Sequence, residues 1–229
     1  DAATGLDIWI ATADGSAPGN VTNRKGDATD PSWSPDGKLI AFTNNGRSDG
    51  IRQVYTVGAV GKNLTRISFD QEEYMPVFTP DGENLAFVMF VASHEVLYLR
   101  NSGDEFKQFS RFDNVELLGR LGYVEHPAYS PDGSWLAYTR TESYQSTRQN
   151  IYSVRTASRG GDIARLTDDN ASREPAWSPD SRWIVFTSNR DGNLEVYIMS
   201  TNGQFQVNLS GAPGIDMQPD WQPLPPPGS

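Results

Sequence analysis

Residues 31–37 read Pro-Ser-Trp-Ser-Pro-Asp-Gly, and an apolar stretch, Leu39–Phe42, follows almost at once. Three more copies and a final partial copy begin at Pro76, Pro127, Pro175 and Pro219. Successive copies start 45, 51, 48 and 44 residues apart. A period of about 40–45 residues, here slightly stretched, is typical of a propeller blade of four antiparallel strands.

The phrase itself predicts two strands and the turn between them. Its first strand carries one aromatic residue, such as Trp33, and Ser/Thr-Pro-Asp-Gly then makes a tight turn. The apolar stretch returns antiparallel as the second strand, and two further strands follow, here Gln53–Tyr55 and Asn63–Ile67. The repeats therefore predict four blades over residues 31–68, 76–110, 127–167 and 175–210.

The two ends of the chain fit the same frame. Residues 1–23 contain a third strand (Asp7–Ile10) and a fourth (Asn20–Thr22), and residues 217–223 contain a first strand. We therefore expect an all-β propeller of about five four-stranded blades, closed by a composite blade that pairs the N- and C-terminal strands. Closure of this kind removes exposed sheet edges. Residues 224–229 are rich in proline and are interpreted as a linker or terminal stub.

The composite blade lacks one strand. In the last full repeat the second-strand Phe186 precedes the third-strand Tyr197 by 11 residues, and counting 11 residues back from Trp9 passes the start of the chain. The second strand is therefore missing, or residues 1–5 crudely replace it. Either this blade has three strands, or the chain is a trimmed piece of a longer protein.

These residues resemble the TolB-type, WD-like propeller repeat, whose pattern is approximately P-x-W-S-P-D-G-x-x-I-A-F followed by a D-G-x-x-I-Y strand. The resemblance covers nearly the whole chain and implies the propeller fold. Such repeats occur in the periplasmic TolB protein, which contacts partner proteins, in propellers attached to peptidases, and in lyases that act on acidic sugars. In contrast to TolB, we expect no preceding α/β domain and about five blades in place of six. Function does not follow from fold alone.

Composition excludes several classes of function. The formal net charge is −10, which argues against nucleic acid, because binding to phosphates needs clustered Lys and Arg. No apolar run approaches the roughly 18 residues that cross a bilayer, so we expect no membrane insertion. The chain has no Cys, which excludes disulfides and thiol chemistry. We expect a monomeric protein in the periplasm or outside the cell, the location that the resemblance implies.

Residues for catalysis are sparse. His94 and His126 are the only histidines, whereas the lyases of the resembling family hold their metal with several. His94 is expected in a hairpin between second and third strands, and His126 in the loop that enters an innermost strand. No Ser/His/Asp set converges, so we predict that the chain is not an enzyme and needs no cofactor.

Carboxylates precede each repeated proline, and we expect them in loops around one mouth of the central channel. As a group they are candidate ligands for Ca²⁺ or for a basic partner segment. They are Asp27, Asp30, Glu72, Glu73, Glu125, Glu174 and Asp216. The alternative is a solvated acidic face whose members cap local turns.

One connection before a repeated proline is unusually long and lies within Arg111–Glu125. Long loops on a rigid scaffold often bind partners. We therefore predict a non-catalytic exported scaffold that binds a protein or peptide at the acidic channel mouth. The predicted contact residues are Glu72, Glu73, Tyr74, Phe112, Leu117, Leu118, Tyr123, Glu125 and His126. The alternatives are a Ca²⁺- or saccharide-binding module and an accessory domain of a peptidase or lyase.

Overall fold

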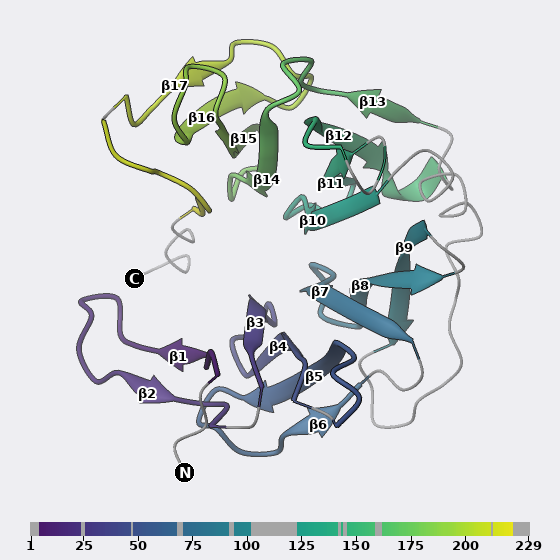
Figure 1. Ribbon diagram of the computed structural model, residues 1–229, viewed down its shortest axis with the longest axis vertical. Coiled ribbons are helices and arrows are strands. Elements are labelled where there is room, and N and C mark those ends of the chain that lie inside the picture. Colours follow the sequence, from purple (N-terminus) through teal and green to yellow (C-terminus); the bar gives the residue numbers. More distant parts are fainter. Residues whose placement is uncertain are drawn as a thin grey trace. The chain divides into compact units, whose positions relative to one another are not determined.

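The computed structural model describes residues 5–23, 26–46, 48–67, 71–91, 94–101, 123–141, 143, 146–158, 162–211 and 213–221. The chain divides into two compact units, residues 1–111 and 112–229. Each unit is a series of antiparallel sheets in which every strand pairs with its neighbour in the sequence (Figure 1). Within the described residues the only helical element is a single 3-10 turn, Thr156–Ser158, and no helix is long and apolar enough to cross a membrane. The all-β prediction is confirmed.

The first unit contains three sheets. The first has two strands, β1 (Trp9–Ile10) and β2 (Gly19–Asn20). The second has four, namely β3 (Ala28–Trp33), β4 (Leu39–Asn44), β5 (Gln53–Gly58) and β6 (Thr65–Arg66). The third has three, namely β7 (Glu72–Phe78), β8 (Asn84–Val91) and β9 (His94–Asn101). The fourth strand predicted there, Lys107–Phe109, lies outside the described residues.

The second unit contains two sheets of four strands. The first consists of β10 (Tyr123–Tyr129), β11 (Trp135–Thr141), β12 (Gln149–Arg155) and β13 (Ile163–Arg165). The second consists of β14 (Ser172–Trp177), β15 (Trp183–Ser188), β16 (Glu195–Ser200) and β17 (Val207–Asn208). Met217–Trp221, the described part of the predicted closing segment, contains no strand. Closure of a ring by the two chain ends stays a prediction.

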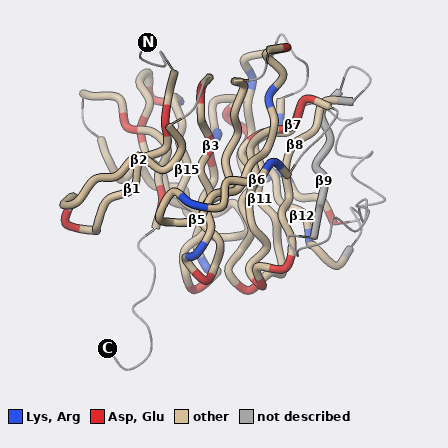
Figure 2. The backbone as a smooth tube through the Cα atoms, turned by 90° about the horizontal axis from the view of Figure 1, so that it is seen from below, with Lys and Arg blue, Asp and Glu red and all other residues tan. Residues whose placement is uncertain are grey.

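Apolar residues on facing sheets form the core of each unit. In the first unit Ile8 and Val21 of the β1–β2 region pack on Phe42 of the β3–β6 sheet. In the second, Ile151 and Leu166 pack on the β14–β17 sheet. Acidic residues occur mainly at strand ends and in turns (red in Figure 2). This pattern keeps most charge out of the layers between sheets, with Glu73 and Glu195 as buried exceptions.

The Ser/Thr-Pro-Asp-Gly turns form as predicted, and the aspartate holds each one together. Asp36 Oδ1 accepts the Ser34 hydroxyl (2.7 Å) and the Lys38 amide (3.1 Å), and Asp81 Oδ1 accepts the Thr79 hydroxyl and the Glu83 amide. Asp132 and Asp180 make the same pair of contacts in the second unit. These repeated Asp residues are therefore turn residues rather than metal ligands.

The innermost strands begin earlier than the phrase suggests. β3, β7, β10 and β14 start three or four residues before the repeated proline. The residues expected in loops therefore lie within strands: Asp30, Glu72, Glu73, Glu125, His126 and Glu174. The expectation was wrong because a bulge lets the strand ladder pass the proline, which has no N–H to donate. His94, expected in a hairpin, opens β9.

Candidate functional site

A bulge with a left-handed residue interrupts every described innermost strand at the repeated proline. In β3, Thr29 pairs with Thr43 and Ser32 with Ala41, so Asp30 and Pro31 together face a single partner residue. The same shift occurs in β7, β10 and β14. The residue before the proline has a positive φ in all five copies: 53° at Asp30, 52° at Met75, 49° at His126, 57° at Glu174 and 56° at Gln218. We call these five the bulge residues.

Positive φ is unfavourable for these side chains. The left-handed region suits Gly, and other residues lose about 1 kcal/mol or more there. At three of the five bulge residues, a hydrogen bond to the neighbouring sheet holds the conformation in place. The Met75 amide donates to Thr43 Oγ1 (3.0 Å), and the Glu174 amide donates to Thr139 Oγ1 (3.0 Å). The Gln218 amide donates to Thr187 Oγ1 (3.1 Å).

The backbone of the bulge is constant, whereas its side chain is not. The five side chains comprise a short carboxylate, a thioether, an imidazole, a longer carboxylate and an amide. Four of them are half-buried and Gln218 is exposed. The same strained backbone thus presents a different side chain in each repeat, and strained backbone of this kind clusters at functional sites.

The predicted acidic residues mostly make local contacts. Asp27 Oδ1 accepts the Leu6 amide (2.9 Å), and Glu125 Oε2 accepts from Gln149 Nε2 (3.1 Å). Glu174 Oε2 accepts both the Thr187 hydroxyl (2.8 Å) and the Gln218 amide (3.1 Å). Within the part of the chain that the structure describes, no three His, Asp or Glu side chains gather closely enough to hold a metal ion.

The predicted contact residues are divided between surface and interior. Glu72 is partly exposed and accepts from Arg52 Nε at 2.7 Å, whereas Glu73 and Tyr74 are buried. The Arg52 guanidinium lies 3.6 Å from the centre of the Tyr74 ring, which gives a cation–π contact. Asp30, Tyr123 and Asp216 are half-buried. Phe112, Leu117 and Leu118 lie outside the described residues.

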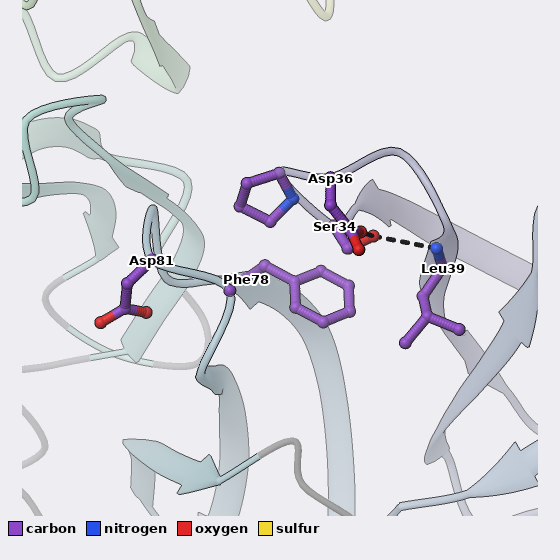
Figure 3. Close-up of a pocket in the computed structure, with 7 residues that line it drawn as sticks. Ser34, Asp36, Leu39, Phe78 and Asp81 are labelled. Carbon is purple, nitrogen blue, oxygen red and sulfur yellow. Dashed lines mark hydrogen bonds between the residues drawn. The ribbon is translucent and has the colours of Figure 1, made fainter.

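A pocket lies between two turns of the first unit (Figure 3). It has a volume of about 370 Å³ and is lined by the turns at Ser34–Asp36 and Asp81–Gly82 and by the side chains of Leu39 and Phe78. The Phe78 ring lies between the two turns, and the Ser34 hydroxyl accepts the Leu39 amide at 2.9 Å. The hydrogen bond from Lys38, followed by that from Ser34, lowers the pKa of Asp36 to about 2. The Thr79 hydroxyl lowers the pKa of Asp81 in the same way.

The matching turns of the second unit are bridged. There the Ser181 hydroxyl accepts the Asp132 amide at 3.1 Å. Gly82 stands where Ser181 stands in the phrase, so it offers no hydroxyl to the turn at Asp36. Sequence reasoning missed the bulge residues as a set and missed this pocket. A usable signal was present, namely the variable residue before each invariant proline.

Repeated four-stranded sheets, bulged innermost strands and Asp-capped turns define a protein of the β-propeller repeat class. The sequence model of the TolB beta propeller domain matches residues 2–116 and 76–224. The chain therefore belongs to the TolB β-propeller domain family.

Individual relatives support the same family. An alignment over 170 residues gives 30% identity to "uncharacterized peptidase YuxL" of Bacillus subtilis. The alignment covers 58% of this chain and 24% of that protein. A second alignment, over 208 residues, gives 26% identity to the Tol-Pal system protein TolB of Francisella tularensis. It covers 89% of this chain and 46% of that protein.

A solved structure gives the fold independently. The crystal structure of TolB from Acinetobacter baumannii aligns with a TM-score of 0.75 at 23% identity, over 95% of this chain and 52% of that chain. The chain thus spans about half the length, or less, of the relatives it matches.

Proposed function

We propose that this chain is a non-catalytic propeller module that binds a protein or peptide partner through its bulge residues and the acidic residues beside them. The observation that carries the proposal is the set of five strained, chemically different side chains on one repeated backbone device. Glycine would adopt this backbone at lower cost, so the choice of side chain has a cause beyond the backbone. At Glu174 that cause includes the hydrogen bonds from Thr187 and Gln218, and for the set as a whole we propose recognition.

The named relatives fit this proposal. One is a component of the Tol-Pal system, and another is named as a peptidase in which the matching region is about a quarter of the protein. In both cases the segment that matches this chain belongs to a larger assembly or chain. We extend the proposal to an exported location, the periplasm or the cell exterior, and to a monomeric module.

The acidic residues have a defined part in the proposal. Glu72 and Glu125 lie in the same strands as bulge residues, three residues before Met75 and one before His126, and Glu174 is itself a bulge residue. With a net charge of −10, the chain is expected to attract a basic segment at long range. The bulge side chains then select among such segments at contact.

The test separates recognition from stability. Immobilised protein captures partners from an exported-protein fraction, and the dissociation constant of the purified partner is then measured for the wild type and for the double variant Asp30→Gly/Met75→Gly. We expect binding to weaken about tenfold or more with no fall in melting temperature, because glycine accepts positive φ without strain.

The matched control is Ala17→Gly, which relieves a positive φ of 51° in an exposed turn between β1 and β2. This variant should bind as the wild type does. If the double variant binds equally well, or if it unfolds at a clearly lower temperature, the bulge side chains serve folding and the proposal fails.

A further inference from the structure

The pocket between the turns at Ser34–Asp36 and Asp81–Gly82 has a volume of about 370 Å³, which is within the range of small-molecule sites. All seven residues that line it are described residues of the first unit. They belong to two neighbouring sheets, β3–β6 and β7–β9, and none of them lies near an end of the chain. The pocket is therefore a feature of one pair of repeats.

The second unit has larger side chains at the matching place. Its repeats carry Trp135 and Trp177 where the pocket has Leu39 and Phe78. Trp177 is buried, and Trp135 is half-buried and packs against the core cluster to which Trp177 belongs. The first unit thus lacks two indole rings that the same repeat places between neighbouring sheets in the second unit.

Gly82 removes a third group from the same place. In the second unit this position is Ser181, whose hydroxyl accepts the Asp132 amide at 3.1 Å and so joins the two turns. Gly82 has no side chain, and within 4 Å a Cβ added there would meet only Pro35, at 3.6 Å. Smaller residues at three positions of the repeat therefore leave a space where the second unit has aromatic rings and a hydrogen bond.

The walls of the pocket are largely apolar. Phe78, Leu39 and the ring of Pro35 line it, and the face of Phe78 lies between the two turns (Figure 3). Aromatic rings pack favourably on one another in offset or edge-to-face arrangements. A flat ring is therefore the group that these walls fit best.

The rim of the pocket is negatively charged. Asp36 and Asp81 stand on the two turns, on either side of the Phe78 ring. A hydrogen bond from Lys38 lowers the pKa of Asp36, and one from Thr79 lowers the pKa of Asp81, so both carboxyls are ionised at neutral pH. Lys38 Nζ lies 2.9 Å from Asp36 Oδ2, but both side chains are more than half exposed, so water and salt weaken this ion pair. An ammonium group can therefore compete for the carboxylate, whereas an anion is repelled.

We infer that this pocket is a binding site for an aromatic amine, a small molecule that joins a flat ring to an ammonium group. The ring packs on Phe78 and Leu39, in the place that indole rings hold in the second unit. The ammonium group lies at the rim with Asp36 and Asp81, where the edge of the aromatic wall adds a cation–π contribution. This site is separate from the bulge residues, and its test does not depend on the proposed protein partner.

The probe is tryptamine, an indole with an ammonium side chain. It is titrated into the whole chain while the methyl signals of Leu39 are followed by NMR. We expect saturable binding that shifts these signals, with a dissociation constant on the order of 0.1–1 mM for a ligand of this size. Indole-3-propionate has nearly the same size but carries a carboxylate, and it should bind about tenfold more weakly.

Variants test the ring and the charge separately. Leu39→Trp introduces the residue of the second unit and should abolish binding, because its indole fills the pocket. Ile51→Trp is the matched control, since it adds an indole at an exposed position at the opposite end of the β4–β5 pair, and it should leave binding unchanged. The double variant Asp36→Asn/Asp81→Asn keeps an acceptor oxygen in both turns, and should bring the affinities for tryptamine and indole-3-propionate to within about threefold of each other.

Gly82→Ser replaces Leu39→Trp if circular dichroism shows that the latter does not fold. It should weaken binding of tryptamine about fivefold or more, because its hydroxyl is expected to join the two turns. Three outcomes would overturn the inference: no saturable binding of tryptamine, unchanged binding by the folded variant, or equal affinity of the wild type for the amine and the acid.

Discussion

The β14–β17 sheet packs against a complete four-stranded neighbour, β10–β13, whereas the β3–β6 sheet packs against the two-stranded β1–β2. The two innermost-strand tryptophans record the difference. Trp177 is 7% exposed and Trp33 is 50% exposed, although each occupies the same position in the same phrase. Burial of this aromatic therefore depends on the first two strands of the preceding sheet and not on the sheet that carries it.

The residues that follow the fourth strands show the same dependence on a neighbouring sheet. Leu166 follows β13 and is 5% exposed, because the β14–β17 sheet covers it. Leu209 follows β17 at the matching position and is 56% exposed, and no later sheet of its unit covers it within the described residues. Each sheet of this repeat thus completes its neighbour's core, so a single repeat cannot bury its own apolar residues.

The largest expected effect comes from removing the two tryptophans in turn. Trp177→Ala should lower the free energy of unfolding by about 3–5 kcal/mol, because it empties a buried aromatic site. Trp33→Ala should cost about 1 kcal/mol or less, because half of its surface already faces solvent. Urea unfolding followed by far-UV circular dichroism measures both. Similar losses for the two variants would contradict the comparison and would show that Trp33 is covered in solution.

The sequence predicted the parts of the fold that depend on local chemistry. Ser-Pro-Asp-Gly specified each turn, and the apolar stretch after it specified the second strand, since both rest on residue properties that need no partner. The positive φ at Met75 and Glu174 could not be predicted, because neither residue favours that region by itself. It results from hydrogen bonds to Thr43 and Thr139, residues 32 and 35 positions away.

The site was harder to predict than the fold for the same reason. The carboxylates before the prolines were correctly noticed as a repeated feature, but their partners, such as Gln149 for Glu125, come from other strands. The second repeat also departs from the others in a way that the phrase hides. In the other three repeats a threonine of the second strand (Thr43, Thr139 or Thr187) accepts a hydrogen bond from a bulge amide. The second repeat has Val88 at this position, and a valine side chain has no hydrogen-bond acceptor.

Removing the threonine acceptor of a bulge amide should lower the free energy of unfolding by a smaller amount, and by the same amount in the two units. Thr43→Val and Thr139→Val each remove the acceptor of a bulge amide while keeping the side-chain shape. Each should lower the free energy of unfolding by about 1–3 kcal/mol, the cost of an amide left without its acceptor. Thr65→Val, on an exposed strand position, should change stability by less than about 0.5 kcal/mol. Unequal losses at Thr43 and Thr139 would mean that the bulge is held differently in the two units.

The smallest effect concerns the turns that line the pocket. Gly82 has a φ of +72° and Ser181 has a φ of +58°, so the backbone at Gly82 is one that serine already adopts in this chain. A Cβ at Gly82 would meet Pro35 Cδ at 3.6 Å, an ordinary contact. Gly82→Ser should therefore change stability by less than about 1 kcal/mol, the net value of one hydrogen bond, and bring its hydroxyl toward the Asp36 amide. Ser181→Gly should remove the hydrogen bond between Ser181 and the Asp132 amide at a similar small cost in stability.

Crystal structures of both variants are the measurement. If the Gly82→Ser pocket stays open with its hydroxyl turned to solvent, the spacing of the turns, and not the glycine, keeps the pocket open.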